Sequence, residues 1–243
     1  MTIIFPMAGL SSRFTNAGYD KPKYMLDIDG NTVFFHAVNS FKNYFKDNNI
    51  VFIYRDTNDT RNFIETECKK MNIQSFQLIK LETETEGQAH TVSLGLEEAK
   101  IDKEESILIF NIDTFRPNFK LPSNIDFNKA DGYLEVFEGV GDNWSFVLPE
   151  ENLPQRVKRT TEKERISNLC SSGLYFFKKY EDFNKIFTNL FEKDIRIKNE
   201  FYIAPMYNDM IKLNKKIYYS KIKMEDIIFC GTPDEYKEIL KEI

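Results

Sequence analysis

The sequence is poor in the features on which several large protein classes depend. Its three cysteines, Cys68, Cys170 and Cys230, are far apart and form no Cys-x-x-Cys pair, so neither a disulfide framework nor a zinc site is predicted. Sparing use of cysteine fits a reducing compartment, and we expect the cytoplasm. No apolar stretch approaches the length of a membrane span, and the first residues show no basic leader with a cleavage site.

An excess of positive charge is also missing. The formal net charge is -5 at pH 7, whereas proteins that bind nucleic acid usually present a basic surface. We therefore expect small-molecule partners and neither nucleic acid nor membrane. The 243 residues contain no internal repeat and no Gly/Ser-rich linker, which favours one large domain.

Strand-like and helical patterns alternate in the first half of the chain. Apolar runs at residues 2–5, 49–54, 75–81 and 106–110 alternate with helical spacing at 33–45, about 60–71 and 88–100. This order predicts an α/β fold with a doubly wound, mostly parallel, Rossmann-like sheet.

The pattern changes beyond about residue 117. Strands are predicted at 132–137, 144–148, 155–160 and 169–177, helices at 180–191 and 201–213, and closing strands at 217–222 and 227–229. A last helix is expected to begin with Thr232 as N-cap and Pro233 at its first position. We interpret residues 117–243 as a mixed or antiparallel acceptor subdomain, continuous with the nucleotide-binding half at 1–116 in a single domain.

The loop after the first strand has the residues needed to bind phosphate. Gly9 exposes backbone N–H groups, Ser11 and Ser12 supply hydroxyls, and Arg13 and Lys23 supply positive charge. A solvated surface loop with ordinary charges explains the same residues, and spacing alone leaves both interpretations open.

Two further segments follow strands of the predicted parallel sheet. Gly87 and Gln88 begin a helix after one strand, and Asp113 follows the apolar strand 106–110. Ligands of open α/β sheets bind at the carboxyl ends of the strands, where a lone carboxylate suits a divalent cation. Asp113 could instead cap a turn.

Taken together, these segments resemble the sugar-phosphate nucleotidyltransferase superfamily. The similar segments, in family order, are residues 7–14 with Lys21-Pro22-Lys23, Gly87-Gln88-Ala89, Asp113 after its strand, Glu162-Lys163, residues 172–176 and Gly231-Thr232-Pro233. The resemblance implies transfer of a nucleoside monophosphate from a nucleoside triphosphate to a phosphorylated small molecule, with release of pyrophosphate. The resemblance is also compatible with assembly of the chain into a homo-oligomer.

The resemblance also implies roles for individual residues. Arg13 and Lys23 would be catalytic, and Mg²⁺ would bind Asp113. Nucleotide-binding residues would be Ala8, Gly9, Leu10, Ser11, Ser12, Gly87 and Gln88, and acceptor-binding residues Glu162, Lys163 and Gly173. Many members have a second metal-binding aspartate where this chain has Phe229, so Asp226, three residues earlier, is a substitute candidate whose alternative is a surface carboxylate.

Within the superfamily, the chain is similar to a capsule-biosynthesis branch. The supporting segments are Asn143-Trp144-Ser145 and residues 200–205, which are close to those of CTP:phosphoglutamine cytidylyltransferases of capsule phosphoramidate synthesis. Three alternatives remain: a sugar-1-phosphate nucleotidyltransferase using UTP, dTTP or CTP, a nucleotide-sugar glycosyltransferase, and a nucleotide-binding module without catalysis. The glycosyltransferase fits less well because Asn111-Ile112-Asp113 replaces the usual Asp-x-Asp.

The histidines and the tryptophan are not predicted to act in chemistry. His36 and His90 lie on predicted helices among apolar residues, so both are expected to pack rather than to bind ligands. Trp144 is expected in the core.

Overall fold

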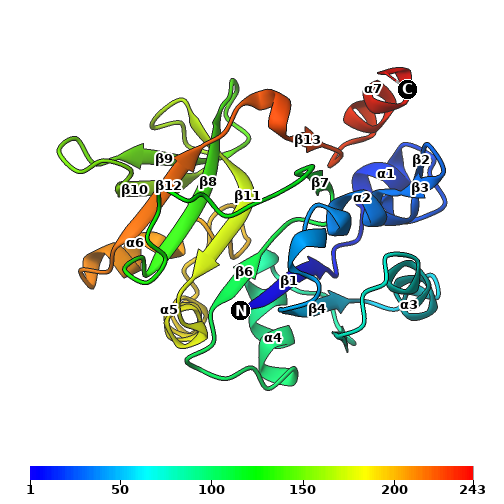
Figure 1. The fold of residues 1–243 in the computed structure, drawn as a ribbon, viewed down its shortest axis with the longest axis horizontal. Coiled ribbons are helices and arrows are strands. Elements are labelled where there is room, and N and C mark those ends of the chain that lie inside the picture. Colours follow the sequence, from blue (N-terminus) through cyan, green and yellow to red (C-terminus); the bar gives the residue numbers. More distant parts are fainter. Residues whose placement is uncertain (243) are drawn as a thin grey trace.

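The elements of the first half form around a parallel sheet in the computed structural model, which describes residues 1–242 (Figure 1). They are β1 (Thr2–Met7), α1 (Ser12–Asn16), β2 (Asp27–Ile28), β3 (Asn31–Thr32), α2 (Val33–Asn39), β4 (Asn49–Tyr54), α3 (Thr60–Lys70), β5 (Phe76–Lys80), α4 (Gln88–Glu98), β6 (Ile107–Ile109) and β7 (Thr114–Phe115). Short 3-10 turns cover Lys23–Met25 and Lys42–Tyr44.

The elements of the second half extend this sheet. They are β8 (Gly132–Glu138), β9 (Ser145–Pro149), β10 (Val157–Glu162), β11 (Leu169–Phe177), α5 (Tyr180–Glu192), α6 (Met206–Lys212), β12 (Ile217–Lys221), β13 (Ile228–Phe229) and α7 (Pro233–Glu242), with a 3-10 turn at Met224–Asp226.

One nine-stranded sheet runs through both halves. Its order is β10-β9-β11-β6-β1-β4-β5, with β8 on β11 and β12 on β8. Strands β6, β1, β4 and β5 are parallel, whereas β11 is antiparallel to β6 and joins the second half to the first. The predicted fold class, a single α/β domain with a mixed extension, is confirmed.

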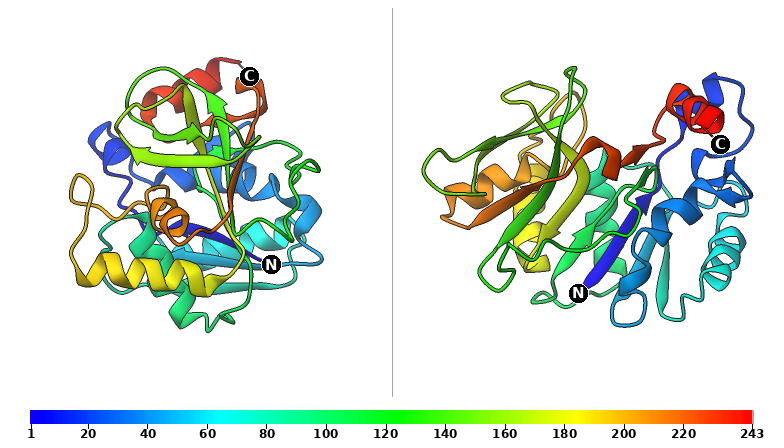
Figure 2. Two further views of the ribbon diagram at one scale, coloured as in Figure 1. Left: turned by 90° about the vertical axis from the view of Figure 1, so that its left-hand side faces the viewer. Right: turned by 45° about the horizontal axis from the view of Figure 1, so that its top comes forward.

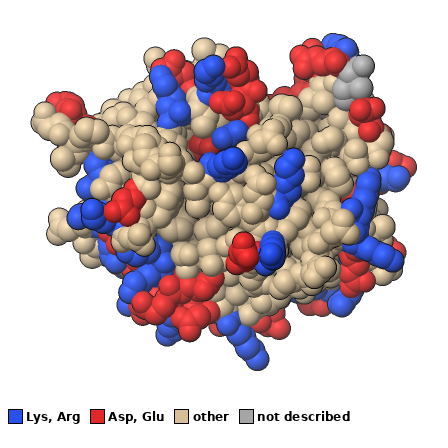
Figure 3. All heavy atoms as spheres, in the orientation of Figure 1, with Lys and Arg blue, Asp and Glu red and all other residues tan. Residues whose placement is uncertain are grey.

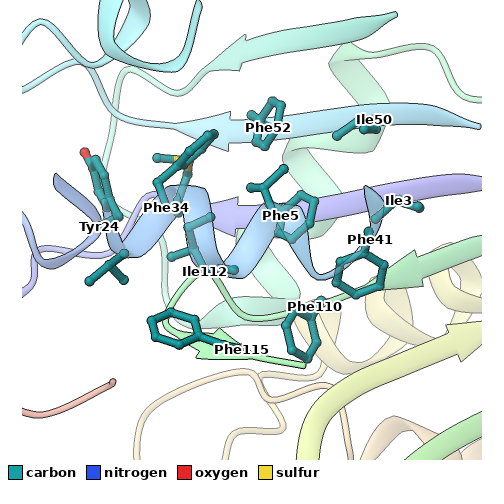
Figure 4. Packing of buried hydrophobic residues seen from close by; sticks show 14 of the residues in the cluster. Ile3, Phe5, Tyr24, Phe34, Phe41, Ile50, Phe52, Phe110, Ile112 and Phe115 are labelled. Carbon is teal, nitrogen blue, oxygen red and sulfur yellow. The ribbon is translucent and has the colours of Figure 1, made fainter. Parts of the chain in front are cut away.

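Helices cover both faces of the sheet, as Figure 2 shows. Successive residues of a strand point to opposite faces, so Ile3 and Phe5 pack with α2 and α3 while Ile4 packs with α4. On the first face the ring of Phe5 stacks on Phe52 and meets Phe41 edge-on, each at 5.5 Å (Figure 4). Burial on both faces explains why these strands are continuously apolar.

Two predicted helices are shorter than expected. The predicted helix at 33–45 ends at Asn39, where the Ser40 hydroxyl donates to His36 O and accepts the Arg116 N–H, so the chain turns and Phe41 enters the core. The predicted helix at 201–213 begins only at Met206. Pro205 lacks an N–H and disfavours a helical conformation in the residue before it, so 201–205 cannot be helix interior.

The end of the second half returns to the first. Strand β13 pairs with β7, and the ring of Tyr236 on α7 meets those of Phe14 and Tyr19 at 6.3 and 5.7 Å. The Tyr236 hydroxyl also donates to Asp27 O at 2.7 Å. Residues 228–242, the end of the second half of the chain, therefore lie against the first half.

A buried ion pair fixes the segment after β6 to the second half. The Arg116 guanidinium donates to both carboxylate oxygens of Glu135 on β8, at 2.7 and 2.9 Å, and its remaining nitrogen donates to Asp226 O at 2.7 Å. Both side chains are almost fully buried, so the pair joins β7, β8 and the approach to β13.

Charges of both signs are distributed over the surface. On the face drawn in Figure 3, basic and acidic side chains are interspersed and much of the middle is uncharged. None of the helices formed by residues 1–242 combines the length and the apolar character that a membrane span requires.

Candidate functional site

Two adjoining cavities open at the carboxyl ends of the parallel strands. The first has a volume of about 690 Å³ and the second about 620 Å³, within the usual range for small-ligand sites. Both are lined by Gln88, Asn111 and Asp113, so these three residues mark where the cavities meet.

The predicted site residues divide between the two cavities. The first is lined by Ala8, Gly9, Leu10, Ser11, Ser12, Lys23, Gly87, Gln88 and Asp113. The second is lined by Arg13, Gln88, Asp113, Glu162, Lys163 and Gly173. The residues that the resemblance gives to nucleotide and to acceptor thus line adjoining cavities, while Arg13 lines the second cavity.

The loop after β1 also holds Lys23 in place. Ser11 adopts a left-handed conformation, with φ 53°, and its hydroxyl accepts the Lys23 N–H at 3.3 Å. The Lys23 ammonium forms an ion pair with Asp113 Oδ2. A loop that follows β1 is thereby joined to the residue that follows β6, at the junction of the cavities.

The junction depends on close contacts around Asn111. Gln88 Nε2 donates to Asn111 Oδ1 at 2.6 Å. Gly173 lies in an irregular part of β11, between Ser171 and Tyr175, with φ +86°. A Cβ at Gly173 would lie 2.2 Å from Asn111 Nδ2, so only glycine leaves room for this amide.

A buried carboxylate forms the floor of the second cavity. Glu162 is 7% exposed and accepts a hydrogen bond from the Ser145 hydroxyl. Burial raises the pKa of Glu162, which the Ser145 hydrogen bond and the nearby Lys163 partly oppose. Burial also raises the pKa of Tyr175, beside Ser145, to about 12, so this phenol stays protonated. The floor offers hydrogen-bond donors and acceptors to a polar ligand.

Lys163 adds a positive charge to the same cavity. Its ammonium donates to the Tyr202 hydroxyl and lies 4.6 Å from the centre of the Tyr202 ring. Burial alone would lower the pKa of Lys163, but the Tyr202 hydrogen bond and the Glu162 and Glu200 carboxylates outweigh it, and the pKa is raised. The group is a fixed cation suited to a phosphate or another anion.

The carboxylates at the junction suit a cation shared with a ligand. A Cβ at Gly231 would lie 3.1 Å from Asp113 Oδ2 and 3.6 Å from Glu235 Oε2, so the glycine keeps space open between them. Glu235 Oε2 already accepts the N–H groups of Gly231 and Thr232, each at 2.9 Å. Among residues 1–242 no group of three potential metal-binding side chains occurs. Mg²⁺ commonly takes one or two carboxylates plus substrate phosphates, so Asp113 fits such an ion.

Asp226 is not brought to this position. Antiparallel pairing of β13 with β7 places Cys230 opposite Asp113, with the Cys230 N–H donating to Asp113 O at 2.8 Å. Asp226 is exposed, and its carboxylate accepts the Lys223 N–H at 3.1 Å within the 3-10 turn. Within the described chain it lines neither cavity, so the substitute carboxylate predicted from the sequence is wrong.

The structure adds residues that sequence reasoning did not assign to the site. They are Asn111, Tyr202, Glu235, Trp144 and Phe229. Thr232-Pro-Asp-Glu235 has the spacing of a capping box, which could have identified Glu235; Thr232 does cap α7, accepting the Glu235 N–H at 3.2 Å. The prediction of a core position for Trp144 is confirmed only in part: the side chain is half-buried and packs against the buried Phe137, but it also meets Phe229 at 4.9 Å on the wall of the second cavity.

The two histidines pack as predicted. His36 lies against Phe115, with its Nε2 3.1 Å from Ile28 O. His90 stacks on Phe187, its Nδ1 accepts the Glu86 N–H at 3.2 Å, and burial lowers its pKa. Neither ring lines the two cavities.

Comparison with solved structures finds the same fold over the whole chain. A nucleoside-diphosphate-sugar pyrophosphorylase from Vibrio cholerae RC9 is 46% identical, with a TM-score of 0.93 over 98% of this chain and 99% of that one. Two distant structures share the fold. A UDP-glucose pyrophosphorylase is 16% identical, with a TM-score of 0.76 over 99% of this chain and 97% of that one. The inositol-1-phosphate CTP transferase from T. maritima is 13% identical, with a TM-score of 0.74 over 99% and 94%.

Neither the protein-family models nor the curated proteins include a match. Identity of 46% along nearly the entire length of the Vibrio cholerae protein nevertheless indicates common descent. The chain belongs to the sugar-phosphate nucleotidyltransferase superfamily.

Proposed function

We propose that this chain is a cytidylyltransferase that moves CMP from CTP to a phosphorylated small molecule and releases pyrophosphate. The observation that carries the proposal is the meeting of two cavities at Gln88, Asn111 and Asp113, with the Lys23 ammonium on Asp113. A transfer reaction needs two ligands whose reacting ends meet beside positive charge.

The nucleotide is assigned to the first cavity. Loop residues 8–12 would surround the phosphates, and the Gln88 amide would contact the base beside Gly87. The acceptor is assigned to the second cavity, where Lys163 would bind a negatively charged group and Glu162 a hydrogen-bond donor.

The reaction needs no nucleophile from the protein. An acceptor phosphate oxygen attacks the α-phosphorus, the bond from this phosphorus to the bridging oxygen of the β-phosphate breaks, and pyrophosphate leaves with that electron pair. A phosphate monoester is largely ionised at neutral pH and needs no general base. Lys23 and Arg13 align the phosphates and neutralise their charge. Bound Mg²⁺ would supply further charge neutralisation from Asp113.

The finer substrates rest on similarity of short segments. Asn143-Trp144-Ser145 and residues 200–205, which resemble those of CTP:phosphoglutamine cytidylyltransferases, contribute Trp144, Ser145 and Tyr202 to the wall of the second cavity. This supports CTP and phosphoglutamine, for capsule phosphoramidate synthesis. The second candidate is a sugar-1-phosphate nucleotidyltransferase using UTP, dTTP or CTP, and the name of the Vibrio cholerae relative favours it.

A pyrophosphate-release assay distinguishes these functions. It crosses CTP, UTP, dTTP, ATP and GTP with sugar 1-phosphates and phosphorylated amino-acid amides. We expect release with CTP and a phosphorylated amide, whereas release only with sugar 1-phosphates would favour the second candidate. A glycosyltransferase would instead release a nucleoside diphosphate, and a nucleotide-binding module nothing.

Variants at the junction test the residue roles. Lys23→Ala and Asp113→Asn should each lower turnover by about 10²- to 10³-fold while remaining folded, as removal of an oxyanion donor does. Lys21→Ala, an exposed lysine of the same loop that lines neither cavity, is the matched control. Near wild-type turnover of either junction variant would remove that residue from the mechanism. Gln88→Ala should change the nucleotide preference, and an unaltered preference would remove the base contact.

A further inference from the structure

The segment between α5 and α6 contributes to both cavities. Glu200 lines the first cavity, and Tyr202 and Ile203 line the second. Phe201, between them, is 2% exposed and packs with Phe187 and Phe191 at 5.6 Å. Residues 200–203, which we call the bridging segment, therefore reach both ligand spaces from an anchored position.

The backbone of the bridging segment is bonded to the loop before α4. The Phe201 N–H donates to Glu86 O at 2.7 Å, and the Ala89 N–H donates to Phe201 O at 3.0 Å. Gly87, between these two partners, has φ +116°, and a Cβ there would lie 2.6 Å from both Phe201 N and Phe201 O. The glycine permits a backbone contact that fixes the segment beside Gln88.

Tyr202, the residue after Phe201, contacts the Lys163 ammonium in the second cavity. The Lys163 ammonium donates to the Tyr202 hydroxyl and also lies over its ring, so one side chain provides both a hydrogen bond and a cation–π contact. The Lys163 N–H donates to Trp144 O at 2.8 Å, which fixes its backbone. A flexible lysine is thus restrained at its base and at its tip.

We propose that Tyr202 is a positioning residue, which sets the Lys163 ammonium in the second cavity at a fixed offset from the nucleotide loop. The connection runs from residues 86–89 through the Phe201 backbone to Tyr202 and Lys163. The position of the Lys163 ammonium is in this way fixed relative to the nucleotide loop and does not depend on a mobile side chain. This inference rests on the proposed function.

The first test is kinetic. Tyr202→Phe keeps the ring and removes only the hydroxyl. The control is Tyr219→Phe, because Tyr219 lies on β12 and lines neither of the two cavities. We expect the KM for the acceptor to rise about tenfold, with the KM for the nucleotide within twofold of wild type. The control should match wild type. An unchanged acceptor KM, or an equal rise in both KM values, overturns the proposal.

The second test does not require turnover. Competitive acetylation with acetic anhydride, followed by peptide mass spectrometry, reports the reactivity of the Lys163 amine relative to other lysines. Because the Tyr202 hydrogen bond raises the pKa of Lys163, Tyr202→Phe should increase its acetylation at least about threefold. Equal labelling overturns the proposal. If wild type releases no pyrophosphate with any acceptor, the proposed function fails, and labelling alone decides whether Tyr202 holds Lys163.

Discussion

Gly173→Ala should damage the junction of the cavities more than it damages the fold. The added Cβ would lie 2.2 Å from Asn111 Nδ2, whereas ordinary contact begins near 3.4 Å, so the amide must retreat by about 1.2 Å. That movement breaks the hydrogen bond from Gln88. Displacement of about 1 Å near reacting groups can cost on the order of 10²-fold in rate, equal to about 2.7 kcal/mol of activation free energy.

The same substitution strains the backbone, and a second glycine isolates that effect. Gly30 has φ +75°, and nothing lies within 4 Å of a Cβ built on it. In Gly173→Ala and Gly30→Ala alike, a left-handed alanine should lower the free energy of unfolding by about 1–2 kcal/mol. Loss of the hydrogen bond to Asn111 should lower it by about a further 1 kcal/mol in Gly173→Ala alone.

The two variants are compared by urea unfolding and by pyrophosphate release. We expect Gly30→Ala to keep wild-type kcat/KM and Gly173→Ala to lose about 10²-fold. Wild-type kcat/KM for Gly173→Ala would refute the reasoning that Asn111 must occupy its observed place. Equal losses in both variants would mean that strain, not the contact with Asn111, is responsible.

Two further predictions concern buried charges. Arg116→Met leaves the Glu135 carboxylate buried without its bidentate partner. Urea unfolding should therefore show that the free energy of unfolding is lower by about 3–5 kcal/mol, and adding Glu135→Leu should restore part of it. A loss below about 1 kcal/mol would contradict this prediction. Burial raises the pKa of Glu162 in the folded protein above the ordinary value of 4.5. As pH rises above 4.5, this carboxyl therefore ionises first in the unfolded chain, and the free energy of unfolding falls until pH passes the pKa of the folded state. Between pH 4.5 and 7, the free energy of unfolding should decline less steeply in Glu162→Gln than in wild type. An equal slope in both would exclude the Glu162 carboxyl as the source of the decline.

The strands of the sheet were predictable because burial leaves a simple pattern. Ile50, Val51, Phe52 and Ile53 of β4 are fully buried, so the strand is apolar at these four consecutive positions. Strand β13 was predicted from the sequence, but its distant partner β7 was not. Strand β7 has only two residues and exists through its pairing with β13, more than a hundred positions later.

The candidate site was predictable where a residue follows a recognisable strand or loop. Lys23 and Asp113 were both singled out from the sequence, although neither position reveals the ion pair between them. Tyr202 was missed because its segment has helical spacing, and its contact depends on Lys163, which follows β10 and is distant in sequence. Asp226 was misplaced because proximity in sequence to the Gly-Thr-Pro turn does not give the register of β13 on β7.

The ribbon of β7 and β13 also determines when in biosynthesis the site can be finished. Residues 114–115 emerge from the ribosome long before residues 228–229, which pair with them. Until residues 228–231 are made, the Asp113 carbonyl lacks the hydrogen bond from the Cys230 N–H, and its carboxylate lacks the Gly231 turn beside it. A nascent chain that stops before residue 228 would contain the parallel strands and the first loop without a complete junction. The Asp113 carboxylate and the Gly231 turn beside it are therefore brought together only after translation has passed the end of the ribbon.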